Sequence, residues 1–151
     1  MPDPLRLIAL DAEDLAIISA NLQDSLIRIG EMAYLPRSKR FALVASRFDW
    51  VAAAEGKNER CRTGLHFERV LKVTRTGFDQ GAADQCLNLL SVVYDGKDAP
   101  AGQVTLIFSG GAGVRLEVEC LEAQLHDIGP RWPAKTCPAH RLDDAPEPHA
   151  R

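Results

Sequence analysis

The sequence lacks any run of the roughly 18 consecutive apolar residues that a membrane-spanning helix requires. The start Met1–Arg6 also lacks the basic segment and long apolar stretch of a secretory signal. Cysteines are scarce, since only four are present and they are widely spaced. Small secreted domains that rely on disulfides are much richer in cysteine. We therefore expect a cytoplasmic protein that has reduced thiols and does not contact a membrane.

The glycine-rich stretch at Gly110, Gly111 and Gly113 does not predict a nucleotide site. A dinucleotide loop needs a strand, a glycine loop and then a helix, whereas here a second strand pattern follows the glycines. A hairpin turn is the favoured interpretation. No Gly-x-Ser-x-Gly sequence indicates a serine nucleophile either. The sequence thus predicts no cofactor.

Cys137 and His140 have the spacing of a metal-ligand pair. Tetrahedral zinc requires further ligands, and no second pair with such spacing exists in the chain. His66 and His126 are distant in sequence and would join only by an accident of folding. We therefore predict no metal site.

The length of 151 residues and the 46% hydrophobic and 26% charged composition are typical of one globular domain. We place that domain at residues 5–130. Prolines recur in the last part of the chain, so residues 131–151 are predicted to form a Pro-rich, flexible tail.

One helix is predicted, over residues 12–22. Asp11 is a suitable N-cap, and Leu15, Ile18 and Leu22 recur at the spacing that places them on one helix face. After this helix the apolar residues alternate with a period of two. This pattern predicts about seven strands, at 25–29, 32–35, 41–50, 63–76, 86–94, 104–108 and 114–120.

The strand pattern has four local features. Residues 25–35 suggest a hairpin that turns at Gly30-Glu31. A bulge near Ser46-Arg47 would place Phe48 and Trp50 on the face of the earlier apolar residues. Residues 51–62 show no strand period and are expected to form a mobile loop. Residues 121–128 fit either a helix or a strand, and Gly129-Pro130 should end either one.

Together these elements predict an α+β fold, mostly antiparallel, with a strongly bent sheet or a partly open barrel. A pleckstrin-homology-like barrel is one version, although such barrels carry their long helix at the C-terminus. The side chains predicted to form the core are Leu15, Ile18, Leu22, Phe41, Leu43, Phe48, Leu65, Phe67, Leu89, Val104, Leu106, Phe108, Leu116 and Val118.

Positive charge is concentrated in residues 37–75, which hold ten Lys and Arg against four acidic residues although the whole chain has a net charge of −3. Such a segment can mark a nucleic-acid surface. Exposed aromatics for base stacking are few there, because only Trp50 and Tyr34 are close. The favoured alternative is that basic and acidic strands neighbour one another, within the chain or across a homo-oligomer.

Candidate binding residues come mainly from the string Arg47-Phe48-Asp49-Trp50. An Asp between two aromatics could be partly desolvated and paired with Arg47 or with an Arg of a neighbouring strand. The simpler alternative is that Phe48 and Trp50 are core and Asp49 faces water. His66 completes the candidate binding residues. Catalytic residues are not assigned, because Glu117, Glu119 and Glu122 are more simply explained as solvated charges.

Several blocks of the sequence, taken as a set, resemble a small uncharacterised bacterial family. These blocks are Leu5–Asp11, Leu22–Asp24, Tyr34–Pro36, Arg47–Trp50, Gly64–Phe67 with Val70, and Leu116–Ala123. The family is a domain of unknown function found mainly in alphaproteobacteria, and the resemblance covers roughly residues 5–130. It implies a bacterial cytosolic origin. It supplies no activity and no site residues, because none is assigned to the family.

Three functions remain open from the sequence. A small non-enzymatic binding or interaction module for an unknown protein or small-molecule partner is favoured, because no motif supplies chemistry. An enzyme that uses carboxylate and His general acid–base chemistry would need a polar pocket containing Asp49 or the glutamates. Nucleic-acid binding through residues 37–75 is the third. We also predict a homodimer, formed where the hairpin 103–120 lies at a sheet edge and meets the basic segment of a second copy.

Overall fold

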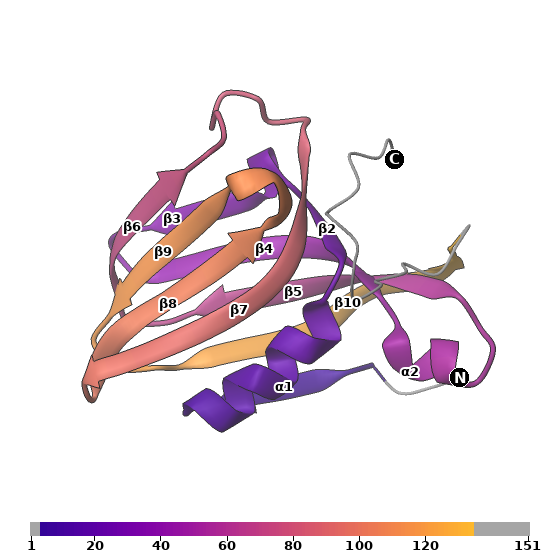
Figure 1. The fold of residues 1–151 in the computed structure, drawn as a ribbon, viewed down its shortest axis with the longest axis horizontal. Coiled ribbons are helices and arrows are strands. Elements are labelled where there is room, and N and C mark those ends of the chain that lie inside the picture. The colour runs from indigo at the N-terminus through magenta and orange to yellow at the C-terminus, as the bar shows by residue number, and fades with distance from the viewer. Residues whose placement is uncertain (1–3, 135–151) are drawn as a thin grey trace.

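The computed structural model describes residues 4–134, which fold around one antiparallel sheet of ten strands (Figure 1). The predicted antiparallel α+β class is confirmed, but the strands number ten rather than seven and the sheet is open. The elements in chain order are β1 (Arg6–Ala9), α1 (Ala12–Leu22), β2 (Ser25–Arg28), η1 (Ile29–Glu31), β3 (Met32–Leu35), β4 (Arg40–Phe48), α2 (Trp50–Ala54), β5 (Glu59–Phe67), β6 (Val70–Thr76), β7 (Cys86–Asp98), β8 (Ala101–Phe108), η2 (Ser109–Gly111), β9 (Gly113–Val118) and β10 (Ala123–Pro133).

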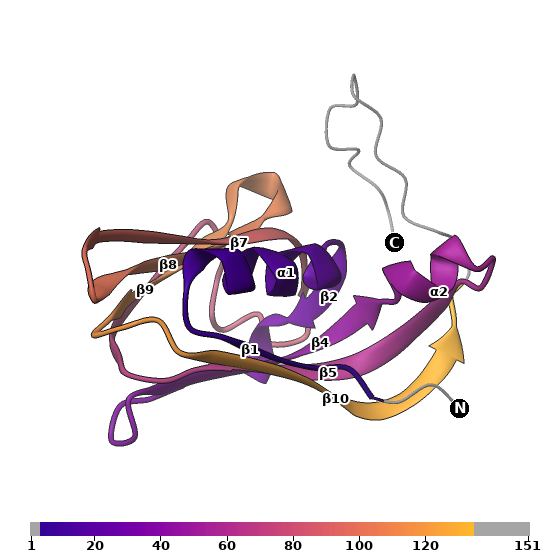
Figure 2. The ribbon, with the colours of Figure 1, turned by 90° about the horizontal axis from the view of Figure 1, so that it is seen from below.

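The sheet bends over on itself into two layers. The strand order is β1-β10-β5-β4-β2-β7-β8-β9-β6, and β3 pairs with β4 beside this path. Strands β1, β10, β5, β4 and β3 form one layer, while β7, β8, β9 and β6 form the other (Figure 2). Because β2 pairs with both β4 and β7, it connects the two layers. The apolar core lies between them, and α1 closes one rim.

Helix α1 has the predicted bounds. The Asp11 carboxylate accepts a hydrogen bond of 2.8 Å from the Asp14 amide, which satisfies one free N–H of the first turn. Leu15, Ile18 and Leu22 are buried, as their spacing predicts. All the side chains predicted to form the core are buried.

Strand β4 departs from the prediction because it has no bulge. It pairs with β5 without interruption from Phe41 opposite Phe67 to Phe48 opposite Arg60. Arg47 therefore keeps the inward parity of Phe41, Leu43 and Ala45, and it is buried. Phe48 therefore lies on the opposite face of the strand from Phe41, Leu43 and Ala45, whereas the predicted bulge would have placed it on the same face.

Three further predictions are corrected. Residues 51–62 are not a mobile loop, because α2 and the start of β5 occupy most of them. Residues 25–35 are not a hairpin, because β2 pairs with β4 and β7 while β3 pairs with β4. The predicted strand at 63–76 is two strands, since the chain turns at Glu68-Arg69 between β5 and β6.

The end of the described chain is a strand. The ambiguous stretch at 121–128 contributes to β10, which continues past Gly129-Pro130 to Pro133. Proline is tolerated there because residues 128–130 form a bulge without partners on β5, so its missing N–H interrupts no ladder. The predicted tail therefore overlaps β10 at residues 131–133. Cys137 and His140 lie outside the described residues.

The described cysteines are free thiols that differ in burial. Cys86 is exposed and Cys120 is half-buried. Cys61, on β5, is the buried one. Among the helices of the described chain, none combines the length and apolarity needed to cross a bilayer.

Candidate functional site

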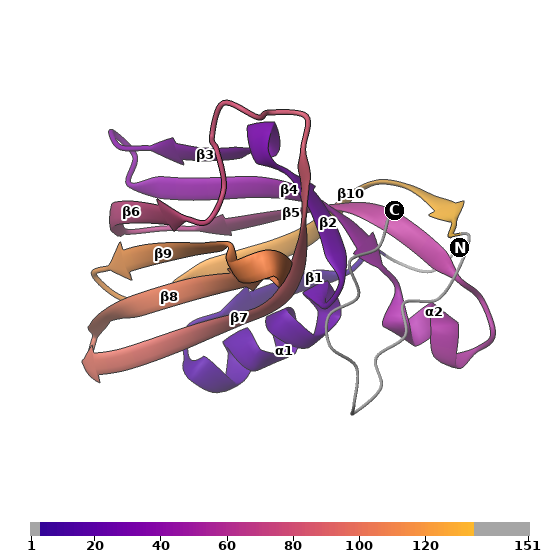
Figure 3. The same cartoon turned by 45° about the horizontal axis from the view of Figure 1, so that its top comes forward.

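A buried polar cluster occupies the end of the sheet where β4 runs into α2 (Figure 3). Three neighbouring strands each place a polar residue at an inward position there: Arg47 on β4, Thr63 on β5 and Asp127 on β10. The residues before them at the same parity are apolar, as in Phe41, Leu43 and Ala45 of β4. The core thus changes from apolar to ionic at this end of the sheet.

Arg47 and Asp127 form the central ion pair. The Arg47 guanidinium donates through Nη2 to Asp127 Oδ2 at 2.8 Å and to Oδ1 at 3.0 Å. Their side chains are only 2% and 4% exposed. Thr63 Oγ1 also donates to Asp127 Oδ1 at 2.7 Å, and the Leu5 amide donates to Oδ2 at 2.9 Å. The carboxylate is therefore satisfied by groups from three separate segments.

Asp49 and Arg131 form a second ion pair beside the first. The Arg131 guanidinium donates through Nη1 to Asp49 Oδ2. The other oxygen of Asp49 accepts from the Ala52 amide at 2.9 Å, so Asp49 is also the N-cap of α2. Arg131 Nη2 lies 3.8 Å from Asp127 Oδ2, which joins the two pairs into one network.

The network keeps both carboxylates ionised. Burial alone would raise the pKa of Asp127, but hydrogen bonds from Arg47, the Leu5 amide and Thr63 outweigh it and leave that pKa below its usual value. Burial alone would likewise raise the pKa of Asp49. The Ala52 amide and Arg131 outweigh it and lower the pKa of Asp49.

Cys61 lies within the same network, and its thiol is buried. Cys61 pairs with Arg47 on one side and with Arg131 on the other. Its thiol is 3.5 Å from the Gly129 carbonyl, to which it donates. Burial and the nearby Asp127 charge raise the pKa of the Cys61 thiol despite the two arginines. A protonated buried thiol is a poor nucleophile and a poor metal ligand.

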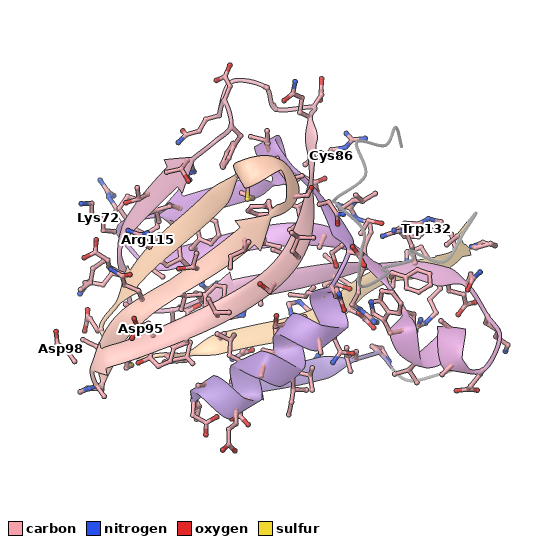
Figure 4. All side chains as sticks on the ribbon, viewed as in Figure 1. Lys72, Cys86, Asp95, Asp98, Arg115 and Trp132 are labelled. Atoms are coloured by element: carbon pink, nitrogen blue, oxygen red, sulfur yellow. The ribbon has the colours of Figure 1, made fainter. Side chains whose placement is uncertain are left out.

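A groove of about 770 Å³ opens above this network, between α2 and the β10 bulge. Asp49, Cys61, Asp127 and Arg131 line it from the network side. The remaining lining residues are Pro4, Val51, Ala52, Glu55, Lys57, Glu59, Ile128, Gly129 and Pro130. Trp132 lies at this same end of β10 (Figure 4). The volume is in the range of small-molecule sites.

Two of the four predicted site residues meet in this network. Arg47 and Asp49 belong to it, and Asp49 pairs with Arg131 of β10, which is separated from β4 by β5. The interpretation that Asp49 simply faces water is wrong. Trp50 does not line the groove, because its Nε1 donates to the Gln23 carbonyl at 3.0 Å and its ring packs edge-on against Phe48.

His66 lies apart from the network, on the outward parity of β5. Its Nδ1 is 2.7 Å from Glu68 Oε2, and Arg40 Nε is also 2.7 Å from that oxygen. The structure does bring His66 near His126, with ring centroids 6.4 Å apart. Nevertheless, within residues 4–134 no three His, Cys, Asp or Glu side chains converge as a metal centre requires.

Sequence reasoning missed Asp127, Arg131 and Thr63. A usable signal existed for Asp127, because Ala123, Leu125 and Asp127 continue one strand parity and place a carboxylate where an apolar residue is expected. The sequence gives no such signal for Arg131, because Arg131 lies opposite Cys61 only as a result of the bulge at residues 128–130.

Acidic side chains of the same chain pair with much of the basic segment 37–75. Lys39 is 2.6 Å from Glu119, Arg40 is 2.7 Å from Glu68, and Arg62 is 2.8 Å from Glu31. Lys72 and Arg69 lie near Glu117 and Glu122 at 3.9 and 3.4 Å. Neighbouring basic and acidic strands therefore account for much of the charge asymmetry, as the favoured interpretation proposed.

No curated protein and no solved structure matches the chain. A family model does match, over residues 5–140, and is described as a protein of unknown function, DUF2948. This match covers nearly all the residues that form the sheet and the buried network. The chain therefore belongs to the DUF2948 family.

Proposed function

We propose that the chain is a small cytosolic binding module that holds a small-molecule ligand in the groove between α2 and the β10 bulge. The observation that carries this proposal is the contrast between the groove's base and its walls. The base is a network of paired arginines and aspartates whose side chains hold one another in place. The walls present Val51 and Ile128, which are 66% and 49% exposed although they are large and apolar. Exposed apolar side chains around a concave site are typical of ligand contact.

The protonation states favour binding over proton transfer. A general acid or base works best with a pKa near the working pH. Ion pairing lowers the pKa values of Asp49 and Asp127, and burial raises that of the Cys61 thiol. The enzyme alternative required a polar pocket containing Asp49, and the groove is one. The carboxylates of Asp49 and Asp127, however, are committed to arginines.

The charges around the groove favour a cationic or neutral ligand over an anionic one. Four carboxylates line it, from Asp49, Glu55, Glu59 and Asp127, against the cations of Lys57 and Arg131. Arg47 beneath the groove neutralises Asp127, so an excess of one negative charge remains. Arg131 already lies within ion-pair distance of three of these carboxylates, so it is poorly placed to receive a phosphate. An apolar body with an ammonium group would satisfy both the walls and the excess negative charge. Nucleic acid, with its phosphates, fits this site poorly.

Three matched fragments test the proposal by NMR titration of the ¹⁵N-labelled protein. Benzylamine, benzyl alcohol and benzoate share one apolar body and differ in charge. We expect amide shifts centred on residues 49–61 and 127–131, largest for benzylamine and smallest for benzoate. Shifts scattered over the surface, or centred elsewhere, would remove the groove as the site. Equal shifts for all three would remove the charge preference alone.

Matched variants localise the response. Val51→Ser and Ile128→Ser should each reduce the benzylamine shifts, because they remove apolar wall. Val93→Ser is the control, since Val93 is 47% exposed on β7 and does not line the groove.

A pleckstrin-homology-like barrel stays a prediction, and the choice of this site does not depend on it.

A further inference from the structure

Within residues 4–134, strand β1 is the end strand of the sheet, with β10 as its single neighbour. The Asp127 amide donates to the Leu5 carbonyl at 2.9 Å, and Leu7 and Ala9 follow in register opposite Leu125 and Ala123. Residues alternate in an antiparallel ladder, so the N–H and C=O groups of the intervening Arg6 and Ile8 point away from β10. Figure 2 shows β1 at the rim beside α1. These backbone groups form an unpaired edge.

This edge has fewer protective features than the other free edges of the sheet. Bulges, charged side chains, prolines and short strand length protect exposed edges. The free edge of β6 has a bulge between Val70 and Lys72 and carries the Lys72 ammonium, and the last part of β10 carries Pro130 and Pro133. β1 has the sequence Arg-Leu-Ile-Ala and a regular register, without a bulge or a proline. Its shortness and the charge of Arg6 are the features that limit pairing.

Exposed apolar side chains are concentrated around the same edge. Ile8 is 57% exposed and Leu10 is 64% exposed, and Ile17 on the adjacent α1 is 54% exposed. Leu10 joins β1 to α1. A second strand laid along β1 would cover Ile8 and Leu10. Their burial would supply the driving force that backbone hydrogen bonds alone do not.

The charges around β1 are self-complementary. Arg6 lies at the start of the strand, while Asp11, Glu13 and Asp14 follow its end at the start of α1. Within the described residues neither Arg6 nor Glu13 forms an ion pair. An antiparallel copy of the same strand would bring each basic end to the acidic end of the other. This complementarity identifies the occupant of the edge as a second copy of this chain.

We propose that the protein forms a homodimer through antiparallel pairing of β1 with the β1 strand of a second copy. Ile8 lies opposite the partner's Ile8, and Arg6 lies opposite the partner's Leu10, beside the acidic start of its α1. The hairpin predicted to mediate dimerisation does not fit, because β8 and β9 lie between β7 and β6 inside the sheet. The two sheets would become one continuous sheet across the two-fold axis.

Sedimentation equilibrium of the full chain over micromolar to millimolar concentrations tests the dimer. We expect the mass to rise from that of one chain toward twice that value. Ile8→Lys should raise the dissociation constant at least ten-fold, because it places a charge at the centre of the contact. Val93→Lys is the control, since Val93 is a comparably exposed apolar residue on β7. A monomer at every concentration, or equal effects of the two variants, would overturn the proposal.

Exchanging the charges of Arg6 and Glu13 gives a second test whose result a folding defect cannot explain. Arg6→Glu should weaken self-association by repulsion from the partner's Glu13, and Glu13→Lys should weaken it by repulsion from the partner's Arg6. A mixture of these two variants restores both contacts, so it should form heterodimers more tightly than either forms homodimers. Native mass spectrometry with one isotope-labelled variant measures this. A random distribution of dimers in the mixture would refute pairing through β1.

Discussion

Arg47 and Asp127 lie 80 residues apart in the chain, yet their side chains meet at 2.8 Å with almost no exposure to solvent. The pair joins β4 to β10 across β5, which places Thr63 between them. A buried pair of this kind adds little net stability over an apolar pair of similar volume. The pair matters for specificity, because any other strand alignment would leave one buried charge without its partner, which is very unfavourable. Arg47 and Asp127 therefore specify how β4, β5 and β10 align.

Removing one partner of the Arg47–Asp127 pair should be much more destabilising than replacing both partners by apolar residues. Arg47→Ala leaves Asp127 buried without its main partner and should lower the free energy of unfolding by about 3–5 kcal/mol. The double variant Arg47→Met/Asp127→Leu should recover most of this loss. Urea unfolding monitored by circular dichroism gives the values. Arg62→Ala is the control, because its surface pair with Glu31 should contribute less than about 1 kcal/mol. A similar loss for Arg47→Ala and Arg62→Ala would contradict this account.

Acid should destabilise the protein through the same network. The pKa values of Asp49 and Asp127 are lowered in the folded state, so the unfolded chain binds protons more readily. The stability they contribute is complete above the ordinary Asp pKa of about 3.9 and is lost as pH falls through the lower folded values. The free energy of unfolding should therefore fall steeply below about pH 4.

Variants separate this effect from general acid unfolding. Asp127→Asn should be less stable than the wild type at neutral pH, and its stability should change less between about pH 5 and pH 2. Asp98→Asn is the matched control, since Asp98 is exposed on β7 and should leave the pH slope unchanged (Figure 4). Parallel pH profiles for Asp127→Asn and the wild type would show that the network does not control acid stability.

Local periodicity was sufficient to predict parts of the fold. The α1 bounds, the core residues and the β8–β9 hairpin follow from spacing of 3.6 or 2 residues, because each involves neighbours in sequence. Pairing between strands that are distant in the sequence leaves no such periodic pattern. β2 and β3 resembled a hairpin with a turn at Gly30, but their partners are β4 and β7.

Only part of the candidate site could be predicted from the sequence. Arg47-Phe48-Asp49-Trp50 attracted attention because charges stand between aromatics, and two of these residues do belong to the network. Their partners Asp127 and Arg131 are reached only through pairing of β10 with β5, and Arg131 also through the bulge at residues 128–130. The assumption that Phe48 and Trp50 share a face with Phe41 and Leu43 led to a predicted bulge in β4 that does not exist.

Asp49 has two roles that substitution can separate. Its Oδ1 caps α2 through the Ala52 amide, and its Oδ2 pairs with Arg131. Asp49→Asn keeps a good N-cap and removes the charge, whereas Asp49→Ala removes both. We expect Asp49→Ala to be less stable than Asp49→Asn by about 1 kcal/mol, the usual contribution of a cap. Equal stabilities in urea unfolding would show that the cap contributes nothing.

The cysteines should differ sharply in reactivity. Cys61 is only 1% exposed, and burial raises the pKa of its thiol, so little thiolate is present at neutral pH. Cys86 is exposed at the start of β7 (Figure 4). Treatment of the native protein with iodoacetamide should modify Cys86 much faster than Cys61, as peptide mass spectrometry can measure. In urea the two rates should converge, which serves as the control for local sequence effects. Rapid modification of Cys61 in the native state would mean that the wall of the groove opens readily, and that the side chains of the ionic network beneath it do not hold one another in place as proposed for ligand binding.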